Sequence, residues 1–211
     1  RLLEAAGEAP PYILVGHSMA GLRVHLMAAR RPDWFSGVVL VDASTPDATE
    51  APIGRGYLNA FAFASRLFAG LSRLGVLKAF ARHGDRIGLE GAARDEKRLF
   101  FPQAEHNRVA AAEVDLWMTT AAQARAAGGY APNLPIAVVT AGADAPDHPV
   151  KAMMAAPATA AQTAYVRHVA GARHATLLGR AFAGEIVQAV QFVAEAAKTK
   201  AAGSPRRPSK I

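Results

Sequence analysis

The sequence contains no cysteine, and aromatic residues make up only 7% of its 211 residues. The absence of cysteine excludes disulfide bonds, a cysteine-based zinc site and a thiol nucleophile. It leaves the cellular compartment open, and a cytoplasmic location is the working expectation. No uninterrupted apolar run reaches the roughly 18 residues that a membrane-spanning helix needs, so we expect no integral membrane segment.

Charged residues are also scarce, at 19% of the chain, whereas 51% of the residues are hydrophobic. This composition excludes intrinsic disorder for most of the chain and predicts one domain with a sizeable core and room for an insertion. The sequence starts at Arg1, in what reads as the end of a helix. We therefore expect a fragment or a processed form of a longer protein.

The net charge of +7 is concentrated at the carboxyl end. Five basic residues and no acidic residue lie within 198–211, which leaves a net charge near zero on the rest of the chain. This segment also contains glycine, proline and serine, so we expect a disordered, solvated tail. No aromatic residues alternate with its charges, as a stacking surface for bases would require, and we expect no nucleic-acid partner.

Four short apolar runs predict the strands of a sheet that is covered on both faces. Most of them lack the polar alternation of a half-exposed strand, which is typical of parallel sheets in α/β proteins. Helical patterns over 19–30 and 181–198 separate or follow them, as right-handed crossover connections require. The predicted strands are residues 12–15, 38–41, 136–140 and 163–169.

The interval 45–130 interrupts this alternation of strands and helices, and its pattern predicts several helices without a convincing strand. Within it, Phe63, Leu67, Leu71 and Leu74 fall on one helical face. We expect this face to fold onto the main domain. Arginines on another face leave open a second interpretation, a basic amphipathic helix on a membrane surface.

A serine stands between the first predicted strand and the helix after it, in the sequence GHSMAG over residues 16–21. A nucleophile on such a sharp turn has strained backbone geometry, so the residues two before and two after it must be small. Gly16 and Ala20 meet this demand. The turn also places Ser18 at a helix N-terminus, where the Met19 N–H would stabilise a developing oxyanion.

This turn resembles the nucleophile elbow of the α/β-hydrolase family, which is usually written G-x-S-x-G. The chain has Ala20 at the fifth position, and Gly21 comes directly after it. The resemblance covers residues 1–198 and implies a mostly parallel sheet flanked by helices, without the family's first strands. It divides the chain into a first core segment, a helical cap, a second core segment and a disordered basic tail, at 1–44, 45–130, 131–197 and 198–211.

The family also implies a catalytic acid and base in the order Ser, Asp or Glu, His, each after a parallel strand. Asp144 follows strand 136–140 and His174 follows strand 163–169. The resemblance therefore assigns Asp144 as the acid and His174 as the base for Ser18. Two alternatives stay open. Asp147 lies on the same loop as Asp144, and Asp42 follows strand 38–41, where some members of the family keep the acid.

In the family, the loop that supplies the second oxyanion donor belongs to the strands that would precede Arg1. The loss of such a donor lowers the rate by about 10²–10³-fold. Without those strands, the strand at 12–15 would also have one unpaired edge. A serine nucleophile further excludes the epoxide-hydrolase and dehalogenase chemistries of this fold, which use aspartate.

The chemistry that remains is acyl transfer to water, from a small and apolar carboxylester, thioester, lactone or amide. We expect substrate contacts from His17, Phe61, Trp117 and Met118. The spacing of the histidines predicts no metal site, and no cofactor is implied. A non-catalytic binding module and an acyltransferase with the same triad are the alternatives, and the oligomeric state is open.

Overall fold

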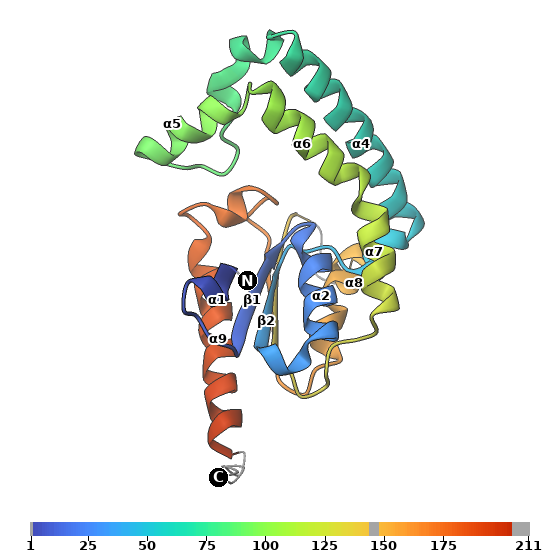
Figure 1. The fold of residues 1–211 in the computed structure, drawn as a ribbon, viewed down its shortest axis with the longest axis vertical. Helices are drawn as coiled ribbons and strands as arrows, with labels where there is room; N and C mark the ends of the chain where they lie inside the picture. The colour runs from blue at the N-terminus through green and yellow to red at the C-terminus, as the bar shows by residue number, and fades with distance from the viewer. Residues whose placement is uncertain (1, 144–147, 204–211) are drawn as a thin grey trace.

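The computed structural model describes residues 2–143 and 148–203 and has a four-stranded sheet at its centre (Figure 1). All neighbouring strands are parallel, and their order in space follows the chain. Each predicted strand is present, with slightly different ends. The strands are β1 (Tyr12–His17), β2 (Phe35–Val41), β3 (Ile136–Ala141) and β4 (Ala164–Val169).

The second strand shows why its sequence is apolar without interruption. Val38 and Leu40 belong to a buried cluster on one face of the sheet, and Val39 and Val41 belong to a cluster on the opposite face. Each of these four residues is at most 1% exposed. Side chains alternate between the two faces of a strand, so a strand that is covered on both faces must be apolar at every position.

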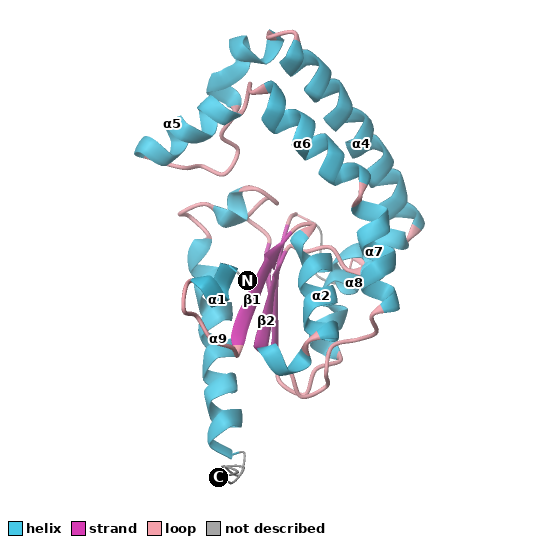
Figure 2. Ribbon diagram, in the orientation of Figure 1, coloured by secondary structure: helices cyan, strands magenta, loops and turns pink. Residues whose placement is uncertain are grey.

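Helices cover both faces of the sheet (Figure 2). The helices α2 (Ala20–Arg30) and α8 (Pro149–Thr159) pack on one face, and the long helix α9 (Ala183–Gly203) packs on the other. Gly37 in β2 permits the close approach of α9, because a Cβ at this position would collide with Val193. The short elements are α1 (Leu2–Ala5), η1 (Pro32–Trp34) and η3 (Thr176–Leu178).

Between β2 and β3 the chain is helical, without a strand at any of these described positions. Figure 1 shows α4 and α6 side by side, reaching well beyond the edge of the sheet. We call residues 52–115 the helical arm. The elements of this region are α3 (Pro46–Glu50), α4 (Pro52–Arg73), η2 (Val76–His83), α5 (Gly91–Phe100), α6 (Ala104–Asp115) and α7 (Trp117–Ala126).

The expectation that the apolar face of α4 folds onto the main domain is wrong. Phe63, Leu67 and Leu74 are 70%, 52% and 78% exposed. The reason is that α4 projects past the sheet and packs instead against α6, where Arg66 forms an ion pair with Asp115 at 2.6 Å.

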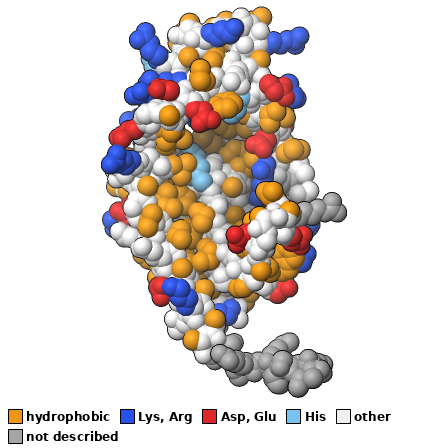
Figure 3. All heavy atoms as spheres, turned by 60° about the vertical axis from the view of Figure 1, so that its left-hand side comes forward, with side chains coloured by type: hydrophobic (Ala, Val, Ile, Leu, Met, Phe, Trp, Pro, Cys, Tyr) orange, Lys and Arg blue, Asp and Glu red, His pale blue; other side chains and the backbone are white. Residues whose placement is uncertain are grey.

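Figure 3 shows hydrophobic side chains over much of one face of the molecule, around a hollow with histidine at its wall.

The ends of the described chain differ in part from expectation. The last helix continues to Gly203, beyond the predicted start of disorder at residue 198. Lys198 pairs with Glu195 at 2.7 Å, and the Lys200 Nζ donates to the Asn133 carbonyl oxygen at 3.0 Å, which anchors these turns. Within the described residues β1 pairs only with β2, so its other edge is free, as predicted.

No single helix among the described residues has the length and apolar character to cross a membrane. A bent pair formed by α4 and η2 meets both criteria only when the two are taken together.

Gly21 offers a test of how tightly the sheet and α2 are packed. A Cβ at this position would lie 2.6 Å from the Ser44 carbonyl oxygen and 2.7 Å from the Ala43 Cβ. We expect Gly21→Ala to lower the free energy of unfolding by about 1–3 kcal/mol, measured by chemical denaturation, because the backbone after β2 must shift.

The matched control is Gly56→Ala in α4, where a Cβ would meet nothing within 4 Å. We expect this change to be neutral or to stabilise by up to about 1 kcal/mol through helix propensity. Equal effects of the two changes would contradict the close contact at Gly21.

Candidate active site

Ser18 occupies a strained turn between β1 and α2. Its φ is +56°, a conformation that residues other than glycine rarely adopt. Hydrogen bonds hold this turn against the loop after β2. The Ser18 N–H donates to the Val41 carbonyl oxygen at 3.3 Å, and the Ser18 carbonyl oxygen accepts from the Ser44 N–H at 2.9 Å. Such strain persists only where the surroundings enforce it, which is typical of functional sites.

The small residues around Ser18 are required by this geometry. A Cβ at Gly16 would lie 2.8 Å from the Val24 Cγ2 and 3.1 Å from the Ala20 carbonyl oxygen. Met19 follows Ser18 directly at the start of α2, where its N–H donates to no carbonyl in the described part of the chain. That N–H is therefore free to bind a negatively charged oxygen.

Asp42 follows β2 directly, and its carboxylate is the best-connected acid at this edge of the sheet. Its side chain is only 5% exposed. The Oδ2 accepts from the His174 Nδ1 at 2.7 Å, and the Oδ1 accepts from the Lys151 Nζ at 2.9 Å and the Ala141 N–H at 3.1 Å. Asp42 also has a positive φ of +40°, so two strained turns stand next to each other.

Among the described residues, the acid in contact with His174 is Asp42. Asp144, and its alternative Asp147, lie outside the described residues. An ionised carboxylate can only accept, so the 2.7 Å contact with Asp42 requires the tautomer of His174 that carries its hydrogen on the Nδ1. Asp42, the third candidate, therefore makes the contact with the histidine that the acid is expected to make.

The contacts of Asp42 keep its carboxyl group ionised. Burial alone would raise the pKa of Asp42, but the hydrogen bonds from His174, Lys151 and the Ala141 N–H outweigh it and lower the pKa to about 2. Hydrogen bonds and nearby positive charge favour the carboxylate over the neutral acid. Asp42 is thus suited to accept the hydrogen of an imidazole and to stabilise its positive charge.

His174 lies on the loop after β4, as predicted, and the imidazole ring of His17 packs against it. The two rings stack with their centroids 4.4 Å apart, and the His17 Nε2 lies 3.2 Å from the His174 carbonyl oxygen. Burial, together with the neighbouring His174, lowers the pKa of His17. His17, which we expected to bind substrate, is therefore a packing partner of His174 in the structure.

Ser18, Asp42 and His174 all line one cavity of about 380 Å³. Of the four residues expected to contact substrate, Trp117 lines it, whereas Phe61 packs edge-on against Trp117 and Met118 joins a buried cluster. Sequence reasoning missed several lining residues. They are Ser44, Ala48, Thr49, Ile53, Gly54, Tyr57, His148, Val150, Lys151 and Met154.

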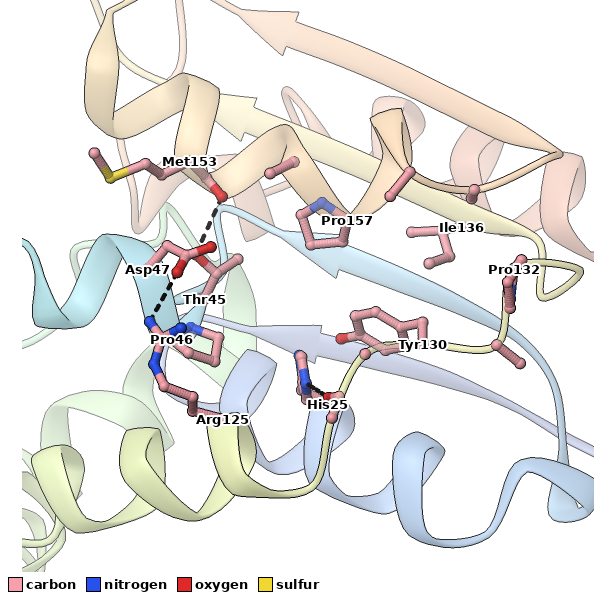
Figure 4. Close-up of a pocket in the computed structure, with 16 residues that line it drawn as sticks. His25, Thr45, Pro46, Asp47, Arg125, Tyr130, Pro132, Ile136, Met153 and Pro157 are labelled. Atoms are coloured by element: carbon pink, nitrogen blue, oxygen red, sulfur yellow. Dashed lines mark hydrogen bonds and ion pairs between the residues drawn. The ribbon is translucent and has the colours of Figure 1, made fainter.

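A second cavity of about 470 Å³ lies between α7, α8 and the start of β3 (Figure 4). Tyr130, His25 and the ion pair of Arg125 with Asp47 line it, and burial raises the pKa of the Tyr130 hydroxyl. None of the three candidate catalytic residues belongs to this cavity. Over the described ranges, no group of three or more histidine or acidic side chains is arranged to hold a metal ion.

Comparison with known proteins gives no match to a protein-family model and none to a curated sequence. Solved structures do match. Cfl2 from Burkholderia cenocepacia superposes with a TM-score of 0.60 at 24% identity, over 89% of this chain and 68% of its own. A structure from a study of carboxylesterases of Nitrososphaera gargenis gives 0.57 at 18% identity, over 92% and 70%. A loop variant of the haloalkane dehalogenase DbeA from Bradyrhizobium elkanii gives 0.58 at 18%, over 96% and 73%.

Identities in this range establish the fold and leave the chemistry to the site itself. The parallel sheet, the helices on both of its faces and the strained serine turn after β1 agree with these matches. The chain therefore has the α/β-hydrolase fold, as the sequence predicted.

Proposed function

We propose that this protein is a serine hydrolase that cleaves an ester-type bond of a small substrate through an acyl-enzyme on Ser18. The observation that carries the proposal is the hydrogen bond from the His174 Nδ1 to Asp42, in a cavity that Ser18 also lines. This bond leaves the Nε2 of His174 as the basic nitrogen. A histidine oriented by a carboxylate beside a strained serine is the arrangement that activates a hydroxyl nucleophile.

In the first step, the Ser18 Oγ attacks the carbonyl carbon of the substrate and its proton passes to the His174 Nε2. The carbonyl oxygen becomes an oxyanion, to which the Met19 N–H at the start of α2 donates a hydrogen bond. The negative charge of Asp42 stabilises the imidazolium that forms. When the tetrahedral intermediate collapses, the bond to the leaving group breaks and the leaving group takes the proton from His174.

In the second step, water replaces the first product. His174 takes a proton from water as the water oxygen attacks the acyl carbon, and the bond to the Ser18 Oγ then breaks. The proton returns to Ser18, which regenerates the free enzyme. If an alcohol or an amine took the place of water, the same residues would carry out acyl transfer.

The lining of the cavity supports a substrate with an apolar acyl or aromatic group. Apolar side chains from α4, α7 and α8 form much of the wall, among them Leu58, Trp117 and Met154. Apolar walls with a few convergent polar groups are typical of sites for small molecules. The first residues of the helical arm reach this cavity, so we propose that residues 45–130 act as its cap.

The proposal predicts covalent labelling of Ser18 by a fluorophosphonate probe, because only an activated serine reacts rapidly with it. Mass mapping of the purified chain should place the adduct on Ser18. Ser18→Ala should abolish labelling, and His174→Ala should slow it by at least about 10²-fold, since the base is lost. No adduct, or an adduct that forms equally fast in His174→Ala, would favour a non-catalytic binding module and overturn the proposal.

The identity of the acid gives a second prediction. Asp42→Asn should slow labelling by about 10³–10⁴-fold, because an amide in this place favours the wrong tautomer of His174. Asp144→Asn is the matched control and should change the labelling rate less than about threefold. A large loss in Asp144→Asn with normal labelling in Asp42→Asn would show that the acid is Asp144, as the family resemblance implied.

A further inference from the structure

Lys151 is a buried cation for which the proposed mechanism has no role so far. It is the only charged residue of α8, and its side chain is 11% exposed. Its Nζ lies 2.9 Å from the Asp42 Oδ1. Withdrawing an ammonium group from water is costly unless an opposite charge and hydrogen bonds compensate for it. The Asp42 carboxylate supplies that compensation and so stabilises the Lys151 ammonium group in its buried position.

The two carboxylate oxygens of Asp42 accept hydrogen bonds from different donors. The Oδ1 accepts from Lys151 and from the Ala141 N–H, whereas the Oδ2 accepts from His174. A carboxylate bound only to His174 could rotate about its Cβ–Cγ bond. With two donors fixed on the Oδ1, rotation would break both bonds, so the Oδ2 stays directed at the imidazole.

We propose that Lys151 is the positioning residue of this site: it holds the Asp42 carboxylate in the orientation that keeps His174 ready to act on Ser18. The inference rests on the proposed function and adds a fourth residue to it. Lys151 acts through Asp42 and not on the substrate. Among the described residues, the charged and titratable groups around the pair are His174 from the loop after β4, His17 from the end of β1 and His148 from the start of α8.

A competing role for Lys151 is to bind the substrate, because it also lines the cavity. The two roles differ in what they change. A substrate anchor contributes to binding, so its loss raises KM. A positioning residue leaves binding intact, and its loss lowers kcat, since a misplacement of about 1 Å is sufficient to slow a reaction by about 10²-fold.

The first experiment compares Lys151→Met, Lys151→Arg and the wild type with p-nitrophenyl butyrate as the probe. Lys151→Met keeps the length of the side chain and removes its charge. We expect its kcat to fall by about 10–10²-fold with KM changed less than twofold. Lys151→Arg keeps a charged donor and should recover most of the loss. Lys198→Met on α9, whose side chain is 72% exposed, is the control and should behave as the wild type.

Asp42 provides a second arm, because residues that act as a unit are not additive. In an Asp42→Asn background, Lys151→Met should change the rate of fluorophosphonate labelling less than about threefold. In the wild-type background, the same change should slow labelling by about 10–10²-fold. Equal effects in both backgrounds would show that Lys151 does not act through Asp42. A rise in KM at constant kcat would assign it to the substrate. Either result overturns the inference.

A third readout does not need turnover. The Nδ1–H of a histidine that is hydrogen-bonded to a carboxylate gives a proton resonance at low field, identified by its absence in His174→Ala. Lys151→Met should shift or broaden it, and Lys198→Met should not. If this dependence is found in a chain that neither labels nor turns over, the role of Lys151 stands and the proposed function fails. An unchanged resonance in a folded Lys151→Met overturns the role of Lys151.

Discussion

The carboxylate of Asp42 is the point at which the separate parts of the site meet. It receives hydrogen bonds from the end of β3, from α8 and from the loop after β4, and it is itself fixed at the end of β2. A carboxylate that is 5% exposed must have its charge compensated by neighbouring donors. The parallel register makes this possible, because it brings the carboxyl ends of β2, β3 and β4 to one edge of the sheet.

The serine turn depends on the same edge. Both Ser18 and Asp42 have positive φ angles, and each such conformation costs about 1–3 kcal/mol in a residue other than glycine. The hydrogen bonds between the two turns and the contact of Gly21 with the loop after β2 offset that strain. Ser18 and Asp42, the proposed nucleophile and acid, are thus held at the ends of neighbouring strands of one sheet, and each turn helps to hold the other.

Local patterns predicted the strands and the serine turn, because buried strands and small residues around a sharp turn leave a strong signal. His174 was chosen through the family resemblance, by its place after the last strand. The proposed acid was harder to predict. Aspartates follow both β2 and β3, and proximity to a strand end does not distinguish them when the strands are neighbours. The helix α8 escaped prediction because it is apolar on nearly every side and contains Pro157, so no helical period marks it. The period of α4 was read correctly, but no pattern within one helix reveals which neighbour it packs against.

The way in which the helical arm joins this site allows the cavity wall to change in evolution without a change in the proposed catalytic groups. Ser18, Asp42, Lys151 and His174 all lie outside residues 52–115. After β2 the chain enters this region at Thr45, the N-cap of α3, whose Oγ1 accepts from the Ala48 N–H at 3.2 Å and donates to the Met153 carbonyl oxygen at 3.1 Å. That anchor ties the departure point to α8, which lies outside the arm. The first residues of the arm add to it, since Gly54 packs closely on the Ala48 carbonyl oxygen and the Arg55 Nε donates to the Glu50 carbonyl oxygen at 2.8 Å. The side chains that line the cavity from the arm can therefore change, and with them the shape of the cavity wall, while Ser18, Asp42, Lys151 and His174 keep their places.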